Sequence, residues 1–172
     1  NLTEENIYVL DSPILSNTQF EKFIKYFGDN YKILDCTFNT DQSLEEAIEL
    51  LKNNAEKAVR EGSTQLILSD KNISETKLPM PMLLCIGAIN THLIKLGLRG
   101  YASINVQTGD ALDTHSFATL IGVGATTVNP YLAFDSLHQR YSKKLFGNFS
   151  FDECVTRYIK SVNAGLLKIM SK

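Results

Sequence analysis

The chain has 172 residues, of which 44% are hydrophobic and 21% are charged, and its formal net charge is −2. This length suits a single domain with one substantial core, and the small charge excludes electrostatic binding to nucleic acid or an anionic membrane. The sequence contains no apolar run of about 18 residues and no basic, then apolar, N-terminal pattern, so we predict neither a membrane span nor a signal peptide. We therefore expect one cytoplasmic domain over residues 1–172.

Hydrophobic periodicity and cap residues predict alternating helices and strands along the chain. After an extended leading segment over 1–15, the expected elements are a helix from Ser16 or Asn17 to Gly28, a strand over 32–38, a helix over 43–61, a strand over 64–69, a polar loop over 71–78, a helix over 81–96, a strand over 101–107, a helix over 113–121, a strand over 126–129, and helices over 131–144 and from 150 to about 169. The helix over 43–61 is the clearest, because Ser43 and Glu46 form a capping-box pattern before apolar residues at helical spacing.

Four strand–helix units in succession predict a parallel α/β sheet with right-handed crossovers. An open doubly wound sheet and a partial (β/α) barrel both fit, since four strands cannot close a barrel that needs eight. We favour a partial barrel of about four βα units with extra helices at both ends. Within one domain, residues 1–30 would hold the leading segment and a helix, 31–145 the βα core, and 150–172 the C-terminal helix. A half-barrel leaves a strand edge and apolar surface uncovered, so this fold predicts partners.

Cysteines and histidines occur without the spacing of a metal site or a disulfide framework. Cys36, Cys85 and Cys154 form no CxxC pair, and we expect them to be buried, reduced thiols. The histidines are His92, His115 and His138, and no two share an HxxxH spacing. A nucleophile elbow and a phosphate-binding glycine loop are also absent from the sequence. The residues alone therefore predict no catalytic residue, no cofactor ligand and no metal ligand.

Polar residues follow the predicted strands, at the edge of the sheet where such folds meet ligands or neighbouring domains. The candidate rim residues are Asp70, Thr108, Asp110, His115 and Asn129. One interpretation is a rim that faces a ligand or an adjacent domain. The other is that these are turn and helix-cap residues, since Asn, Asp and Thr are favoured there in any case.

Several sequence blocks resemble the central domain of the glutamate synthase large subunit. The blocks are residues 10–15 (LDSPIL), 58–70 (AVREGSTQLILSD), 81–84 (PMLL), 92–99 (HLIKLGLR), 122–133 (GVGATTVNPYLA) and 165–172 (GLLKIMSK). They span nearly the whole chain in the family's order. The chain departs from the family at 90–92, where a His-rich turn is common, at Lys71, where an Arg is common, and at His115, where a His pair is common. These departures weaken a residue-by-residue transfer of inter-domain contacts but leave the apolar pattern intact.

The resemblance implies a multidomain flavoenzyme that makes L-glutamate from L-glutamine and 2-oxoglutarate. An amidotransferase domain would release ammonia, and a synthase domain with FMN and a 3Fe-4S cluster would reduce the 2-iminoglutarate formed from it. NADPH, NADH or ferredoxin would supply electrons, so a small subunit or ferredoxin is an implied partner. The central domain is implied to be non-catalytic, to link the two catalytic domains of the same chain and to help enclose the ammonia passage.

Two alternatives stay open at this point. The chain could be an independent small half-barrel that binds FMN or a phosphorylated ligand at the rim. It could also act mainly in subunit assembly.

Overall fold

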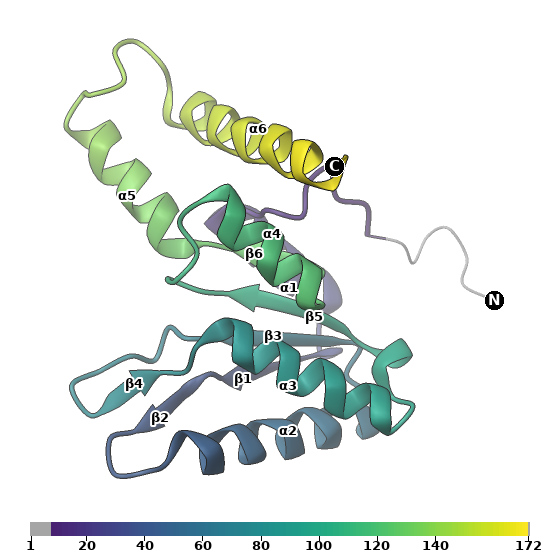
Figure 1. Ribbon diagram of the computed structural model, residues 1–172. Helices are drawn as coiled ribbons and strands as arrows, with labels where there is room; N and C mark the ends of the chain where they lie inside the picture. Colours follow the sequence, from purple (N-terminus) through teal and green to yellow (C-terminus); the bar gives the residue numbers. More distant parts are fainter. Residues whose placement is uncertain (1–7, 172) are drawn as a thin grey trace.

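The structure is a computed structural model that describes residues 8–171 (Figure 1). In chain order its elements are α1 (Asn17–Phe27), β1 (Tyr31–Asp35), β2 (Thr37–Asn39), α2 (Leu44–Arg60), β3 (Gln65–Ser69), β4 (Lys77–Pro79), α3 (Met82–Lys95), the 3-10 helix η2 (Arg99–Tyr101), β5 (Ser103–Gln107), α4 (Thr114–Val123), β6 (Thr127–Asn129), α5 (Tyr131–Ser142) and α6 (Phe151–Met170). Residues 1–7 of the predicted leading segment and residue 172 of the last family-like block lie outside the described residues. Among the helices of residues 8–171, none is long and apolar enough to cross a bilayer.

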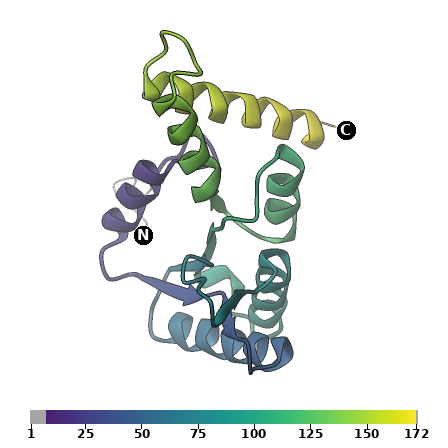
Figure 2. The ribbon, with the colours of Figure 1, turned by 90° about the vertical axis from the view of Figure 1, so that its left-hand side faces the viewer.

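The main sheet has four parallel strands in the order β1–β3–β5–β6, which is their order in the chain. A doubly wound sheet would instead reverse its strand order at a switch point. Helices α2, α3 and α4 lie on one face of this sheet and α1 lies on the other (Figures 1 and 2). The predicted partial (β/α) barrel with parallel strands is therefore confirmed, and the doubly wound alternative is not.

The predicted strand over 32–38 is wrong as a single element. The chain leaves the main sheet at Cys36, whose N–H donates to the carbonyl of Ser69 while its own carbonyl accepts from the N–H of Met80. The following strand, β2, pairs antiparallel with β4, which lies at the end of the segment predicted as a polar loop. A second, two-stranded sheet therefore extends from the carboxyl end of β1.

Apolar side chains of alternate strand positions form the core beneath α2, α3 and α4. Leu66, Leu68, Ile104, Val106 and Val128 are all fully buried there. Since successive side chains of a strand point to opposite faces, these even-numbered positions share one face of the sheet. Hydrophobic burial on this outer face is the main stabilising term of the fold.

All three cysteines are buried and free. Cys36 and Cys85 belong to the outer core. A hydrogen bond with the thiol of Cys85, together with burial, raises the pKa of Cys36 well above its ordinary value. The thiol of Cys36 therefore stays protonated at neutral pH and acts as a small core residue.

The opposite, inner face of the sheet carries a buried row of polar side chains. Asn105 donates from Nδ2 to Oε1 of Gln65 at 2.9 Å and accepts at Oδ1 from the hydroxyl of Thr127 at 2.8 Å. Asn105 is completely buried, so these bonds replace the ones that water would otherwise make. The row joins β3, β5 and β6 by side chains in addition to their backbone ladders.

Helix α1 covers the apolar part of the inner face. Its Phe20 and Phe23 pack with Leu15 and with Ile67 of β3. Ser16 is the N-cap of the helix and forms a capping box with Gln19, which settles the choice that the sequence left open between Ser16 and Asn17 as the cap. The amphipathic sequence of α1 is thus explained by a second, smaller apolar cluster.

The segment before α1 runs along the edge of β6 that faces away from β5. The N–H of Leu15 donates to the carbonyl of Val128 at 2.9 Å, and the N–H of Val128 donates to the carbonyl of Pro13 at 2.8 Å. The extended conformation predicted for the leading segment is therefore present in its last residues. It caps the β6 edge of the sheet.

The substitution Asn105→Ala should destabilise the fold by about 1–3 kcal/mol for each buried group that it leaves without a partner, namely those of Gln65 and Thr127. The matched control is Ser103→Ala on the same strand and face, where the free energy of unfolding should change by less than about 0.5 kcal/mol. Urea unfolding of both variants measures the difference. Equal losses would show that the polar row adds nothing to stability.

Candidate functional site

The carboxyl ends of β3, β5 and β6 bring the five candidate rim residues to one side of the molecule, but in two different states. Asp70, Thr108 and Asn129 are buried, with exposed fractions of 2%, 0% and 0%, whereas Asp110 and His115 are exposed. Because a buried side chain cannot reach an approaching ligand, only the exposed pair is available to a partner without rearrangement.

Asp70 organises the turn that follows β5. Its carboxylate accepts from the hydroxyl of Thr108 at 2.6 Å and from the N–H of Gly109 at 3.1 Å. The hydroxyl oxygen of Thr108 in turn accepts from the N–H of Asp110 at 3.1 Å. A β-carbon at position 109 would lie 2.5 Å from Cδ1 of Leu132, so a larger residue there would require the Leu132 side chain to move. These contacts fix the loop that presents Asp110.

Tyr131 packs beside the same carboxylate. Burial, followed by the negative charge of Asp70, raises the pKa of Tyr131 to about 12, so its phenol stays neutral at physiological pH. The Nζ atom of Lys71 lies 5.2 Å from the centre of the Tyr131 ring. The arrangement holds the start of α5 against the loop after β3.

Asn129 belongs to a second row of hydrogen bonds along the strand ends. The hydroxyl of Ser69 donates to Oε1 of Gln107 at 2.9 Å, and Nε2 of Gln107 donates to Oδ1 of Asn129 at 3.2 Å. Nδ2 of Asn129 then donates to the carbonyl of Leu15 and to Oδ1 of Asn17, at 3.0 and 2.9 Å. The row ties three strands to the start of α1, which is a structural task. Sequence reasoning missed Gln107, although the alternation of polar and apolar residues along β5 was a usable signal.

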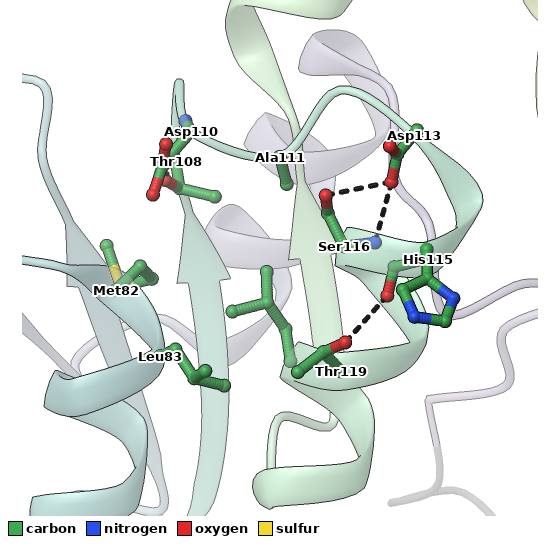
Figure 3. A pocket seen from close by; sticks show the side chains of 10 residues that line it. Met82, Leu83, Thr108, Asp110, Ala111, Asp113, His115, Ser116 and Thr119 are labelled. Carbon is green, nitrogen blue, oxygen red and sulfur yellow. Dashed lines mark hydrogen bonds between the residues drawn. The ribbon is translucent and has the colours of Figure 1, made fainter.

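A pocket of about 350 Å³ opens between the start of α3, the β5–α4 loop and α4 (Figure 3). Its lining residues are Met82, Leu83, Thr108, Asp110, Ala111, Asp113, His115, Ser116, Thr119 and Leu120. The pocket therefore includes three of the five residues that the sequence analysis selected, together with apolar side chains from α3. The remaining two, Asp70 and Asn129, lie outside its lining.

Two of the polar side chains that line this pocket, those of Asp113 and Ser116, form the N-terminal cap of α4. Asp113 accepts from the N–H of Ser116 at 2.7 Å and from its hydroxyl at 2.8 Å (Figure 3). These bonds hold the pKa of Asp113 below its ordinary value, so it is ionised at neutral pH. With the carboxylate of Asp110 nearby, the pocket is acidic, and its helix N-terminus is already capped. Such a site disfavours FMN or another phosphorylated ligand, which needs free N–H groups or cations.

Within residues 8–171 there is no group of three or more His, Cys, Asp or Glu side chains that could hold a metal ion. His92 bonds instead through Nε2 to Oε2 of Glu56 at 2.9 Å, and Glu56 also accepts from Arg60 at 2.8 Å. The ring of His138 lies edge-on to that of Phe151, with centroids 5.1 Å apart. These two histidines thus have structural contacts on the surfaces of helices.

The substitution Asp70→Ala should destabilise the chain by roughly 1.5–3 kcal/mol, because it leaves the buried hydroxyl of Thr108 and the part-buried N–H of Gly109 without their charged acceptor. The control Asp110→Ala removes an exposed carboxylate and should change the free energy of unfolding by less than about 0.5 kcal/mol. Chemical denaturation of the two variants provides the comparison. A larger loss for Asp110→Ala would contradict the assignment of Asp70 as the buried support.

The stability of the chain should also depend on Tyr131 at high pH. The folded chain favours the neutral phenol of Tyr131, whose pKa is about 12 there and near 10 in the unfolded chain. The stability that this preference contributes is therefore complete below about pH 10 and is lost as the pH rises through about 12. Between about pH 10 and 12, the free energy of unfolding of the Tyr131→Phe variant should therefore decrease less steeply than that of the parent chain. The exposed Tyr101→Phe should behave like the parent chain. Identical pH profiles for all three would contradict this account.

Comparison with known proteins identifies the family. The sequence model of the glutamate synthase central domain matches residues 1–172. The glutamate synthase (NADPH) large chain of Azospirillum brasilense is 41% identical over 173 residues, which cover 99% of this chain and 11% of that protein. The corresponding large chain of Bacillus subtilis (strain 168) is 41% identical over 165 residues, and the chloroplastic ferredoxin-dependent glutamate synthase of Oryza sativa subsp. japonica is 38% identical over 178 residues.

Both of the latter alignments cover 95% of this chain and 11% of the relative. The chain thus spans about a tenth of the length of these curated relatives. It belongs to the glutamate synthase central domain family.

Proposed function

We propose that this chain is the non-catalytic central domain of a glutamate synthase large chain. In this role it links the amidotransferase domain to the FMN synthase domain and helps enclose the passage of ammonia between them. The observation that carries the proposal is the match of residues 1–172 to the glutamate synthase central domain family. The similar curated proteins are glutamate synthase large chains. The parent enzyme would make L-glutamate from L-glutamine and 2-oxoglutarate.

The cofactors of the proposed parent enzyme lie outside this domain. FMN and a 3Fe-4S cluster would belong to the synthase domain, and the relatives bear the names of NADPH-dependent and ferredoxin-dependent enzymes. We assign no cofactor ligand among residues 1–172, and the acidic pocket at the strand ends supports that assignment. The cytoplasmic location expected from the sequence stays a prediction.

A rigid domain suits the task of a spacer between two active sites. Ammonia that escapes into water is protonated and lost as a nucleophile, so the passage must exclude bulk solvent. The side-chain rows through Asn105 and Gln107 bind neighbouring strands together and so resist deformation of the sheet. A flexible linker would let the separation of the two sites fluctuate.

We assign the five rim residues to two tasks. Asp70, Thr108 and Asn129 hold the loops and the strand ends in position, as their buried hydrogen bonds support. Asp110 and His115, at the mouth of the pocket, contact a neighbouring domain of the same polypeptide.

The double substitution Asp110→Ala with His115→Ala, made in the full-length enzyme, tests this assignment. A loosened contact would let ammonia escape, so glutamine hydrolysis should exceed glutamate formation by several-fold instead of matching it. The measurement is the ratio of the two rates in one reaction mixture. The matched control is Asp29→Ala with His138→Ala, an exposed acid and histidine away from the pocket, which should keep the two rates equal. Equal rates in the Asp110/His115 variant would contradict the assignment.

A further inference from the structure

Of the two edges of the main sheet, the described residues cover one and leave the other unpaired. The β6 edge is capped by Pro13, Ile14 and Leu15 through backbone hydrogen bonds. The opposite edge is β1, and within residues 8–171 it pairs only with β3. One side of a five-residue parallel strand is therefore open.

The backbone groups on this open side can be identified from the ladder. The carbonyl of Asn30 accepts from the N–H of Gln65, and the N–H of Cys36 donates to Ser69. In a parallel ladder alternate residues bond to the same neighbour, so the even-numbered residues of β1 face β3. The odd-numbered residues, Tyr31, Ile33 and Asp35, direct their N–H and C=O groups away from the sheet.

Strand β1 carries the charged residues Lys32 and Asp35, but the residue at the centre of its open edge is apolar. Natural edge strands usually carry a charge, a proline or a bulge that blocks pairing with another strand. Here the central residue of the three is Ile33, whose side chain is 50% exposed on the face where its register partner Ile67 is buried. The apolar surface of the inner face thus continues to the edge without a cover.

An opening of about 350 Å³ lies alongside this edge, between β1 and α2. Lys32 and Asp35 of β1 line it together with Asn54, Lys57 and Glu61 of α2. Unpaired backbone donors and acceptors, an exposed isoleucine and this space occur at one place. Together they match the requirements of an added strand, which binds by its backbone and alternates its side chains between two faces.

We propose that a strand of the parent polypeptide from outside residues 1–172 pairs with the open edge of β1 and extends the sheet. The inference rests on the proposed function, in which this chain is one domain of a longer polypeptide. The chain spans 11% of the length of its relatives, so most of such a polypeptide lies outside these residues and can supply a strand. The added strand carries apolar residues on the side that covers Ile33. On its other side it carries polar residues that meet Lys57 and Glu61.

Hydrogen exchange in the full-length enzyme, resolved to single amides, tests the pairing. The amides of Tyr31, Ile33 and Asp35 should exchange as slowly as those of Lys32 and Leu34, which already bond to β3 and serve as the internal reference; we expect agreement within about tenfold. Exchange of the outward amides more than about a hundredfold faster than the reference would overturn the proposal.

The variant Ile33→Pro sharpens the test, because it removes an outward N–H while leaving the bonds between β1 and β3. It should accelerate exchange at Tyr31 and Asp35 without exposing Lys32 and Leu34. The control Ile33→Val keeps both the N–H and the strand preference, and should leave all four rates unchanged. Unchanged rates in Ile33→Pro would also overturn the proposal.

Cross-linking identifies the occupant. Lys32 and Lys57 line the opening, so an amine-reactive reagent applied to a mixture of ¹⁵N-labelled and unlabelled enzyme should join them to a segment outside residues 1–172 of the same polypeptide. Links solely between labelled and unlabelled copies would show that a second copy fills the edge and would refute the chosen occupant. Slow exchange without any link to such a segment would refute it as well. None of these measurements depends on ammonia transfer, so the pairing and the proposed function can fail separately.

Discussion

The strict alternation of side chains along parallel strands is the constraint on which this structure depends. In β3 and β5 the even positions are leucine, isoleucine and valine, and they are buried under α2, α3 and α4. The odd positions include Asn105 and Gln107, whose amides bond to side chains of neighbouring strands. A shift of one residue in register would bring these amides under the helices and the apolar side chains to the opposite face. Burial on one side and hydrogen bonding on the other therefore select the same pairing.

The same alternation determines what the carboxyl edge of the sheet can do. Polar side chains at the strand ends mostly bond to each other, as the row from Ser69 through Gln107 to Asn129 does. Asp70 is likewise engaged by the turn after β5. The exposed pocket contains the carboxylates of Asp110 and Asp113, and Asp113 already caps α4. This distribution supports the proposal that the domain is non-catalytic.

Local signals predicted the helices well and the sheet less completely. The capping box of Ser43 and Glu46 and that of Ser150 and Glu153 are present as expected, because a cap involves residues only three apart. The strand over 32–38 was predicted as one element since its composition gives no sign of a break. Its division at Cys36 depends on partners in β3 and β4, which lie more than thirty residues away. Such pairing leaves no mark in the periodicity of the strand itself.

From the amino-acid sequence alone follow the fold class, the order of the βα units, the resemblance to the glutamate synthase central domain and the set of rim candidates. Each of these depends on local periodicity or on short blocks of residues, which can be read without coordinates. The tertiary structure alone separates the buried supports Asp70, Thr108 and Asn129 from the exposed Asp110 and His115. It also shows that one sheet edge is capped and the other open. Burial and edge pairing are properties of segments brought together from distant parts of the chain, so only their packing decides them.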